Sequence, residues 1–329
     1  MKKIKVISLG GTISALGKNR LDFKDYTSGK MTGEQLVGEI PEINEIADVS
    51  FTQLDNVSST AINVNHWIAL KDKIHTYIHE DKYDGIVISH GTNTLEETAY
   101  FLHLTVNTNK PLVLTGAQRP FSAMSSDAPI NLLHALRVAA AEESYNKGVL
   151  VVLNGTISCA RNVTKTSTYT LEAFQSANLG FLGFIEADGK VVYYQRPVKK
   201  HTTSSRFAGL DFKIFHEIAI LYSYAGATGD LINYLAASGK YAGIVMAGTG
   251  AGRFSPLEDR ALKEAEEKGL LIVRSSRVGR GRVVDIDHYS FLQAITADNL
   301  SPQKARILLM LALQVTKDKA EIQDLFDSH

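Results

Sequence analysis

Short apolar runs alternate with amphipathic stretches through the first half of the chain. The runs predict buried strands at residues 4–10, 84–90, 111–117 and 148–156. Apolar residues spaced three or four apart predict helices at residues 32–40, 67–80, 95–106 and 127–143, the first of which Pro41 ends. Strands that alternate with helices favour a parallel sheet with right-handed crossovers.

The apolar pattern weakens after residue 193, and a second alternating set begins near residue 217. Ser301 and Pro302 predict the start of the final helix, with the serine as cap and the proline at the first helical position. We therefore predict an α/β protein with a larger N-terminal parallel-sheet domain and a smaller C-terminal α/β domain. The expected boundaries are 1–194 for the N-terminal catalytic domain, 195–214 for a linker and 215–329 for the C-terminal domain.

The composition is that of an ordinary globular protein of two domains. Its 329 residues include 35 basic and 35 acidic side chains, so net charge gives no indication of binding to nucleic acid or a membrane surface. No apolar run is long enough to span a bilayer, and the short run after two N-terminal lysines is predicted to be the first strand, not a signal peptide. We expect a cytoplasmic location, or a periplasmic one if a signal peptide was removed before residue 1.

Cysteine usage excludes two kinds of site. Cys159 is the only cysteine, so no internal disulfide can form, and we expect it to be a small buried apolar residue. No group of cysteines and histidines has the spacing of a zinc site.

Two polar turns follow predicted strands and carry candidate chemistry. Gly10 and Gly11 precede Thr12, and a glycine turn with exposed N–H groups beside a hydroxyl suits a nucleophile next to an oxyanion hole. Thr92 and Asn93 follow the strand at 84–90, and open α/β sheets bind ligands at the carboxyl ends of their strands. Taken alone, the first motif is more often a plain strand-to-loop turn, and an ordinary polar turn explains the second motif about equally well.

Two other motifs are less specific. Lys165 lies between hydroxyl residues and can act as a base if burial lowers its pKa, although a solvated surface lysine gives the same pattern. Gly248, Gly250 and Gly252 follow a predicted strand but lack the G-x-G-x-x-G spacing, and no Walker lysine follows them. A nucleotide site is therefore not expected.

Seven stretches that span the chain suggest a family. In order they are GGTIS, YTSGK, HGTNTLEETAYFL, TGAQRPFSAMSSDAP, VLVVLNGTISCARNVTKTST, VRSSRVGRG and SPQKARILLMLAL. Together they resemble the bacterial-type L-asparaginase/glutaminase family. The resemblance implies a small amide substrate, no cofactor, a mobile lid near residues 13–32, and a homotetramer built from intimate dimers whose active sites are shared between subunits.

The resemblance assigns catalytic roles to four residues. Thr12 matches the nucleophile, and Tyr26 matches the lid tyrosine that helps to activate it. Thr92 matches a second catalytic threonine, and Lys165 matches the lysine paired with that threonine.

The resemblance also implies substrate contacts. Ser59, eight residues before Trp67, matches the serine that holds the substrate α-carboxylate. Ala117 supplies a backbone carbonyl near the leaving amide, and Gly91 belongs to the same turn as Thr92 and is expected at the substrate.

The chain departs from the family around the substrate's α-ammonium. Asn93 replaces an aspartate that pairs with the lysine and binds the ammonium. Thr60 stands in place of a glutamine, and Ala251 in place of an asparagine. A glutamate expected from the partner subunit has no clear counterpart, because only Asp285 and Asp287 lie in a shortened segment there.

These changes predict an altered substrate. A buried ammonium without its carboxylate costs about 3–5 kcal/mol, so free L-asparagine is expected to bind poorly. We expect cleavage of a small ω-carboxamide, through a threonine acyl-enzyme, in a substrate that lacks a free α-ammonium. Arg253, Arg280 and Arg282 are candidates for binding an additional anionic group, although arginines of this kind are more often solvated surface charges. Two alternatives stay open: an ordinary L-asparaginase whose amine contacts come from elsewhere, and a catalytically inactive ligand-binding homologue.

Overall fold

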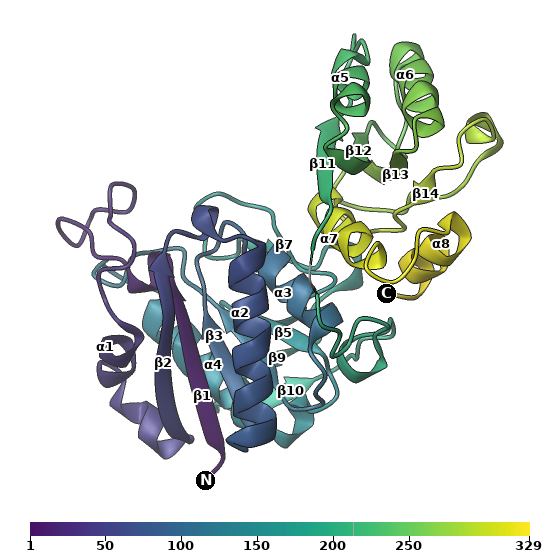
Figure 1. Cartoon of the computed structure of the whole chain (residues 1–329). Helices are drawn as coiled ribbons and strands as arrows, with labels where there is room; N and C mark the ends of the chain where they lie inside the picture. The colour runs from purple at the N-terminus through teal and green to yellow at the C-terminus, as the bar shows by residue number, and fades with distance from the viewer. Residues whose placement is uncertain (213) are drawn as a thin grey trace. The chain divides into compact units, whose positions relative to one another are not determined.

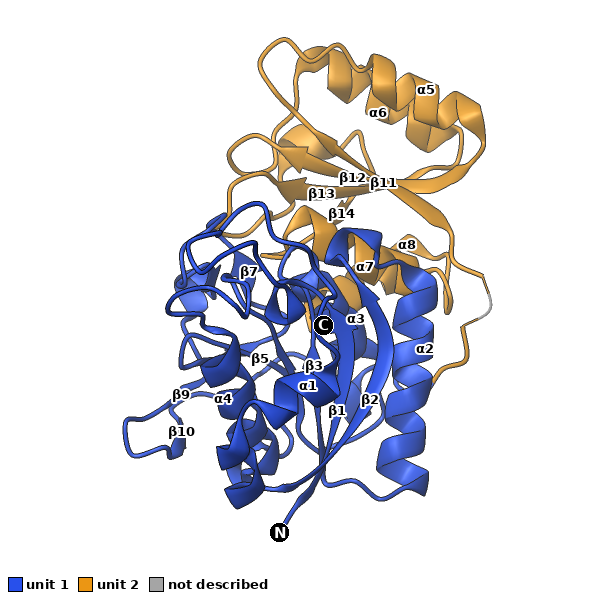
Figure 2. Ribbon diagram, turned by 90° about the vertical axis from the view of Figure 1, so that its left-hand side faces the viewer, with its two compact units in different colours: residues 1–209 blue, residues 210–329 orange. Residues whose placement is uncertain are grey.

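The computed structural model describes residues 1–212 and 214–329 and divides into two compact units (Figure 2). The first is Met1–Gly209 and the second is Leu210–His329. Each unit contains a mainly parallel sheet with helices, so the predicted α/β class with a larger N-terminal and a smaller C-terminal part is confirmed. The boundary between the units falls inside the segment predicted as a linker. Within the first unit, Phe207 is fully buried and Gly209 N–H donates to the Thr105 carbonyl at 3.0 Å.

Five parallel strands form the centre of the first unit (Figure 1). They lie in the spatial order β2-β1-β3-β4-β5, with bounds β1 Lys3–Gly10, β2 Asp48–Val57, β3 Gly85–Ser89, β4 Leu112–Thr115 and β5 Val149–Leu153. Strands β3, β4 and β5 are apolar along nearly their whole length because helices cover both faces of the sheet.

Four α-helices flank this sheet. Helices α1 (Gly33–Gly38) and α4 (Ala128–Ala140) cover one face, and α2 (Val64–His75) and α3 (Leu95–Thr105) cover the other (Figure 2). Helix α2 begins at an Asn63 cap and continues into a π-helical turn, Thr76–Glu80. On the α4 face, Val6, Val87 and Leu132 belong to one buried apolar cluster, which also contains Cys159, as expected for the single cysteine.

The sheet is extended by antiparallel strands that the sequence pattern did not predict. The expectation of one strand at 148–156 is wrong, because β5 ends at Leu153 and the chain returns as β6 (Thr156–Cys159). Asn154 and Gly155 have φ of 51° and 72°, the left-handed pair that closes a two-residue hairpin. Four further strands belong to the unit. Strands β9 (Gly183–Ile185) and β10 (Val191–Tyr193) continue the sheet beyond β6, and β7 (Thr164–Lys165) and β8 (Phe174–Gln175) form a separate two-stranded ribbon.

The second unit has a four-stranded parallel sheet. The order is β11-β12-β13-β14, with bounds β11 Glu217–Tyr222, β12 Tyr241–Gly248, β13 Leu271–Ser276 and β14 Ile295–Thr296. Its helices are α5 (Asp230–Ser238), α6 (Pro256–Glu267), α7 (Pro302–Ala312) and α8 (Lys319–Ser328).

The helix predicted from Ser301 and Pro302 is α7. Its N-cap is Ser301 and its first residue is Pro302, as predicted, although the serine side chain makes no capping hydrogen bond. It is not the final helix, because α8 follows it and buries Ile322 and Phe326, which lie one turn apart on one face. No helix in the described ranges, 1–212 and 214–329, has the length and apolar character needed to cross a membrane.

Candidate active site

Polar turns gather at the carboxyl edge of the first unit's sheet. Thr12 follows β1, Ser59 follows β2, and Thr92 follows β3. Strands β1 and β3 are direct neighbours although β2 lies between them in sequence, which is the kind of reversal where open α/β sheets form ligand crevices. A cavity of about 690 Å³ opens there. Its lining residues are Gly11, Thr12, Lys24, Tyr26, Ser28, Ser58, Ser59, Gly91, Thr92, Asn93, Glu96, Gln118, Lys165, Thr166, Ser167, Thr168 and Tyr169.

Two glycines bring the threonine turns into backbone contact. Gly11 has φ 92° and ψ −169°, a conformation that is essentially restricted to glycine. A Cβ on Gly11 would lie 2.3 Å from the Gly91 Cα, and a Cβ on Gly91 would lie 2.8 Å from the Ser59 Oγ. Since no side chain fits at either position, the turns after β1, β2 and β3 converge on one small volume.

Two hydrogen-bonded side-chain pairs lie at this cavity. The Thr12 Oγ1 lies 3.1 Å from the Tyr26 hydroxyl, and the Lys165 Nζ donates to the Thr92 Oγ1 at 2.8 Å. Strand β7 places Lys165, whose backbone pairs with Phe174 of β8. Burial lowers the pKa of Lys165 from its ordinary value, and the nearby charge of Glu96 raises this pKa and partly opposes the effect. A lysine with a lowered pKa is better suited to accept a proton at neutral pH.

Ser59 connects the substrate side of the cavity to the Thr92 turn. Its Oγ accepts from the Asn93 N–H at 3.2 Å, and its carbonyl accepts from the Thr94 hydroxyl at 2.7 Å. The Asn93 side chain is exposed and lines the cavity, so a neutral amide is presented to a ligand at this position.

A buried hydrogen-bond chain fixes the Gly91–Thr92 peptide from behind. The Trp67 Nε1–H donates to the Thr98 Oγ1 at 2.9 Å, which leaves the Thr98 hydroxyl to donate to the His90 Nε2 at 2.9 Å. The His90 Nδ1–H then donates to the Gly91 carbonyl at 2.7 Å. Burial lowers the pKa of His90 to about 4, so the imidazole is neutral at pH 7.

The same chain orients a backbone donor. In a trans peptide the N–H points opposite to the C=O, so holding the Gly91 carbonyl also fixes the direction of the Thr92 N–H. Among the described residues this N–H has no acceptor. An oriented donor without a protein partner is what an oxyanion site requires.

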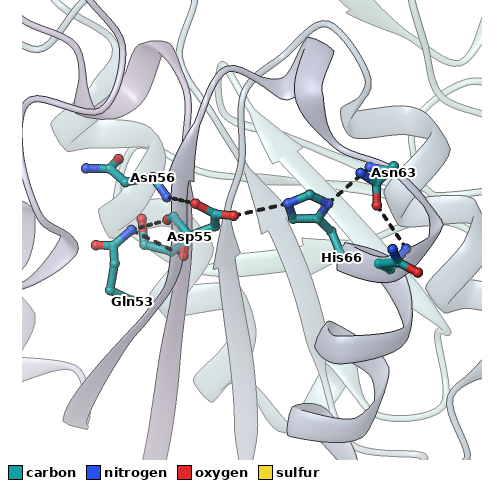
Figure 3. A network of polar contacts seen from close by, with 7 residues as sticks. Gln53, Asp55, Asn56, Asn63 and His66 are labelled. Atoms are coloured by element: carbon teal, nitrogen blue, oxygen red, sulfur yellow. Dashed lines mark hydrogen bonds and ion pairs between the residues drawn. The ribbon is translucent and has the colours of Figure 1, made fainter.

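A second network anchors the connection that carries Ser59 (Figure 3). The Asp55 carboxylate lies at the end of β2, accepts from the Asn56 N–H at 2.7 Å, and lies 3.0 Å from the His66 Nε2. The other ring nitrogen of His66 accepts from the Asn63 N–H at 3.3 Å, at the start of α2. The network therefore ties β2 to α2 across the turn that contains Ser59.

Most of the residues predicted from the sequence lie together in this cavity, and two do not line it. Thr12, Tyr26, Ser59, Gly91, Thr92, Asn93 and Lys165 are all lining residues. Thr60 is exposed and its hydroxyl lies 2.9 Å from the Ser58 Oγ, outside the lining. Ala117 is fully buried, and its neighbour Gln118 lines the cavity instead.

The sequence analysis missed several lining residues. Lys24 and Ser28 lie two residues on either side of Tyr26 and line the cavity with it, so their closeness to Tyr26 in sequence was a usable signal for both. Residues 166–169 directly follow Lys165 and add hydroxyl groups to the wall. Glu96 is a further lining residue that the sequence did not single out.

The predicted residues of the second unit lie in two of its loops. Ala251 is exposed in the turn after β12. Arg280 is exposed, and the Arg282 Nε donates to the Asp298 Oδ1. Asp285 is exposed and lies 3.9 Å from the buried Arg274 guanidinium.

Comparisons with known proteins cover both units. Residues 3–199 match the family described as Asparaginase, N-terminal, and residues 217–326 match the Glutaminase/Asparaginase C-terminal domain. The chain belongs to the asparaginase family. As a member of that family it is a hydrolase that acts on amides. The predicted family and the predicted enzyme class are therefore both confirmed.

Relatives in the asparaginase family match over essentially the whole chain. L-asparaginase 2 of Escherichia coli (strain K12) is 42% identical over 334 residues, covering 100% of this chain and 94% of the relative. Glutaminase-asparaginase of Pseudomonas fluorescens biotype A is 37% identical over 332 residues, covering 99% of this chain and 90% of the relative. The crystal structure of a probable cytoplasmic L-asparaginase from Campylobacter jejuni superposes with a TM-score of 0.96 at 39% identity, and the match covers 100% of both chains.

Proposed function

We propose that this asparaginase-family enzyme hydrolyses a small ω-carboxamide to a carboxylate and ammonia through a Thr12 acyl-enzyme. The observation that carries the proposal is the meeting of the Thr12–Tyr26 and Thr92–Lys165 pairs on one cavity wall. A hydroxyl becomes a nucleophile when a neighbouring base removes its proton, and each pair provides such a neighbour.

The proposed reaction has two steps. The Thr12 Oγ1 attacks the amide carbon while its proton passes to the Tyr26 oxygen and the Tyr26 phenolic proton passes on to the amide nitrogen, and the oxyanion is stabilised by backbone N–H groups near Gly11 and Thr92. The C–N bond then breaks and ammonia leaves. A water molecule, deprotonated with the help of the Thr92–Lys165 pair, then hydrolyses the ester and restores Thr12. Residues 13–32 serve as the lid, since Lys24, Tyr26 and Ser28 line the cavity from this segment.

We propose further that the substrate lacks a free α-ammonium group. Asn93 presents a neutral amide to the cavity, and the charged lining residues are Lys24, Lys165 and Glu96, so cations outnumber anions. Such a lining favours an anionic ligand. Suitable substrates keep the ω-amide and the α-carboxylate and carry either no nitrogen or an acylated nitrogen at the α-position.

Ordinary L-asparaginase activity is the second candidate. The names of the relatives favour it, and Glu96 is a carboxylate in the cavity lining that can bind an ammonium group. An inactive ligand-binding homologue is the third candidate, and it predicts binding without turnover.

Ammonia release separates the three candidates. We expect turnover of succinamate or N-acetyl-L-asparagine and at least about 100-fold lower kcat/KM for L-asparagine, because a site that lacks a polar partner discriminates strongly. Asn93→Asp should raise kcat/KM for L-asparagine. The reverse preference, with asparagine as the best substrate, would establish the ordinary L-asparaginase. Ligand binding by calorimetry without any ammonia release would establish the inactive protein.

The proposed assembly rests on the family. The proposed location rests on the Campylobacter jejuni relative named as cytoplasmic, and the family also contains a Haemophilus influenzae relative named as periplasmic. We propose a homotetramer arranged as a dimer of dimers, which sedimentation velocity would test. We propose a cytoplasmic location, which cell fractionation would test.

A further inference from the structure

Glu96 is the only carboxylate among the residues that line the cavity. It lies in the first turn of α3, one residue after the helix begins at Leu95, and only 6% of it is exposed. The next residue, Glu97, is also in the first turn but does not line the cavity. The two glutamates are therefore adjacent in the same helical turn, and only Glu96 faces the cavity.

Lys165 lines the same cavity as Glu96. Lys165 is half-buried and donates to the Thr92 Oγ1 at 2.8 Å, and Glu96 is the one charged group whose field raises its pKa against the effect of burial. The other lining residues with ionisable side chains are Lys24, Tyr26 and Tyr169, none of which is a carboxylate. Asn93, on the same wall, is also neutral.

We infer that Glu96 is a positioning residue for the Thr92–Lys165 pair, whose buried carboxylate balances the charge that Lys165 gains when it takes the Thr92 proton. The inference rests on the proposed function. In the step concerned, the Thr92 O–H bond breaks, its proton binds the Lys165 Nζ lone pair, and the Thr92 oxygen takes a proton from the attacking water. Lys165 becomes an ammonium beside Glu96, so the product of the transfer is a charge pair instead of an isolated buried cation.

Glu96→Gln tests this inference, with Glu97→Gln as the matched control. Both changes remove one negative charge from the first turn of α3, so an effect of the helix dipole would be the same in both. The readout is the titration of Lys165, followed by competitive labelling with acetic anhydride and mass spectrometry across pH. This measurement needs no turnover.

We expect the Lys165 pKa to fall by about one unit in Glu96→Gln, since an opposite charge close to a buried group shifts its pKa by about 1–3 units. In Glu97→Gln the shift should stay below about 0.3 units. Glu96→Asp should recover most of the shift, and Asn93→Asp combined with Glu96→Gln should restore the Lys165 pKa by returning a carboxylate to this wall. Equal shifts in Glu96→Gln and Glu97→Gln, or no shift in either, would overturn the inference.

Kinetics provide a second readout. The inference predicts that Glu96→Gln moves the acid limb of the kcat profile to lower pH and lowers the kcat plateau above that limb about three- to tenfold, because a base with a lower pKa is weaker. An increase of KM for L-asparagine with an unmoved pH profile would instead assign Glu96 to the substrate ammonium and overturn the inference. A wild-type protein that releases no ammonia would refute the proposed function alone, since the labelling result stands without it.

Discussion

Both units carry a Gly–Thr turn at the carboxyl end of a parallel strand, and the two turns differ in what faces them. After β1, Gly11 lies against the backbone of Gly91 from a neighbouring strand, and Thr12 faces a tyrosine hydroxyl. After β12, the turn closes on itself. Thr249 exchanges two backbone hydrogen bonds of 2.8 Å with Arg253, and its hydroxyl donates to the Arg253 carbonyl at 3.0 Å.

The difference shows what converts a turn into a site. In the second turn the hydroxyl is engaged by its own backbone, so its proton has a permanent acceptor. In the first turn the hydroxyl meets the Tyr26 hydroxyl from another segment, and Gly11 allows the turn to lie against the backbone of Gly91. The local sequence is similar, and the surrounding strands decide the chemistry.

The largest expected effect is that of removing the proposed nucleophile. Thr12→Ala should lower ammonia release by at least about a thousandfold, as loss of a covalent nucleophile does in other hydrolases. Thr249→Ala, at the self-closed turn, should keep kcat within about threefold. A coupled assay of ammonia on the best amide substrate measures both. If Thr12→Ala released ammonia as fast as the parent, the first turn would have no advantage over the second.

The glycine contact is expected to matter next. Gly11→Ala should reduce the free energy of unfolding by about 3–5 kcal/mol, because the new Cβ meets the Gly91 backbone and the φ of 92° is strained for alanine. Gly250→Ala, where a Cβ would meet nothing within 4 Å but φ is 49°, should cost only about 1 kcal/mol. Urea denaturation measures both. Equal losses would show that strain alone, and not close approach, makes Gly11 necessary.

The pH dependence of stability tests the support behind the Gly91–Thr92 peptide. The pKa of His90 is lowered to about 4 from an ordinary value of 6.5, so the fold favours the neutral ring. The corresponding stability is fully present above pH 6.5 and is lost as pH falls toward 4, by about 3 kcal/mol at about 1.4 kcal/mol per unit. His90→Asn should lose this slope, measured by urea denaturation at pH 7 and pH 4. The exposed His216→Asn is the control, and an unchanged slope in His90→Asn would contradict the assignment.

The smallest expected effect is at the turn after β2, which carries Ser59. His66→Ala removes the partner of the Asp55 carboxylate, and a half-exposed contact of this kind contributes about 1 kcal/mol. Because the network positions the turn that carries Ser59, KM should rise by about three- to fivefold with kcat nearly unchanged. Substrate titration of ammonia release measures the two constants. His75→Ala, an exposed residue on the same helix, should change neither.

Elements with strong apolar periodicity were predictable from the sequence, and these are most of the alternating strands and helices of both units. Strand β2 was missed because no continuous apolar run marks it. The β5–β6 hairpin was missed because the Asn154–Gly155 turn signal was read as the end of a strand. Helix α8 was missed because its two buried residues, Ile322 and Phe326, form a short apolar pattern. Glu96 carries no local signal that it faces a cavity.

By itself, the sequence determined the α/β class, the family, and the presence of polar turns after β1 and β3, because periodicity and motifs are local properties of a chain. Only the tertiary structure decided that these two turns meet the turn after β2, that Lys165 bonds to Thr92 while Thr60 points elsewhere, and that Glu96 faces the cavity while Glu97 does not. The reason is physical: contacts between residues such as Thr92 and Lys165, 73 positions apart, depend on strand order and on the backbone approach that glycine permits.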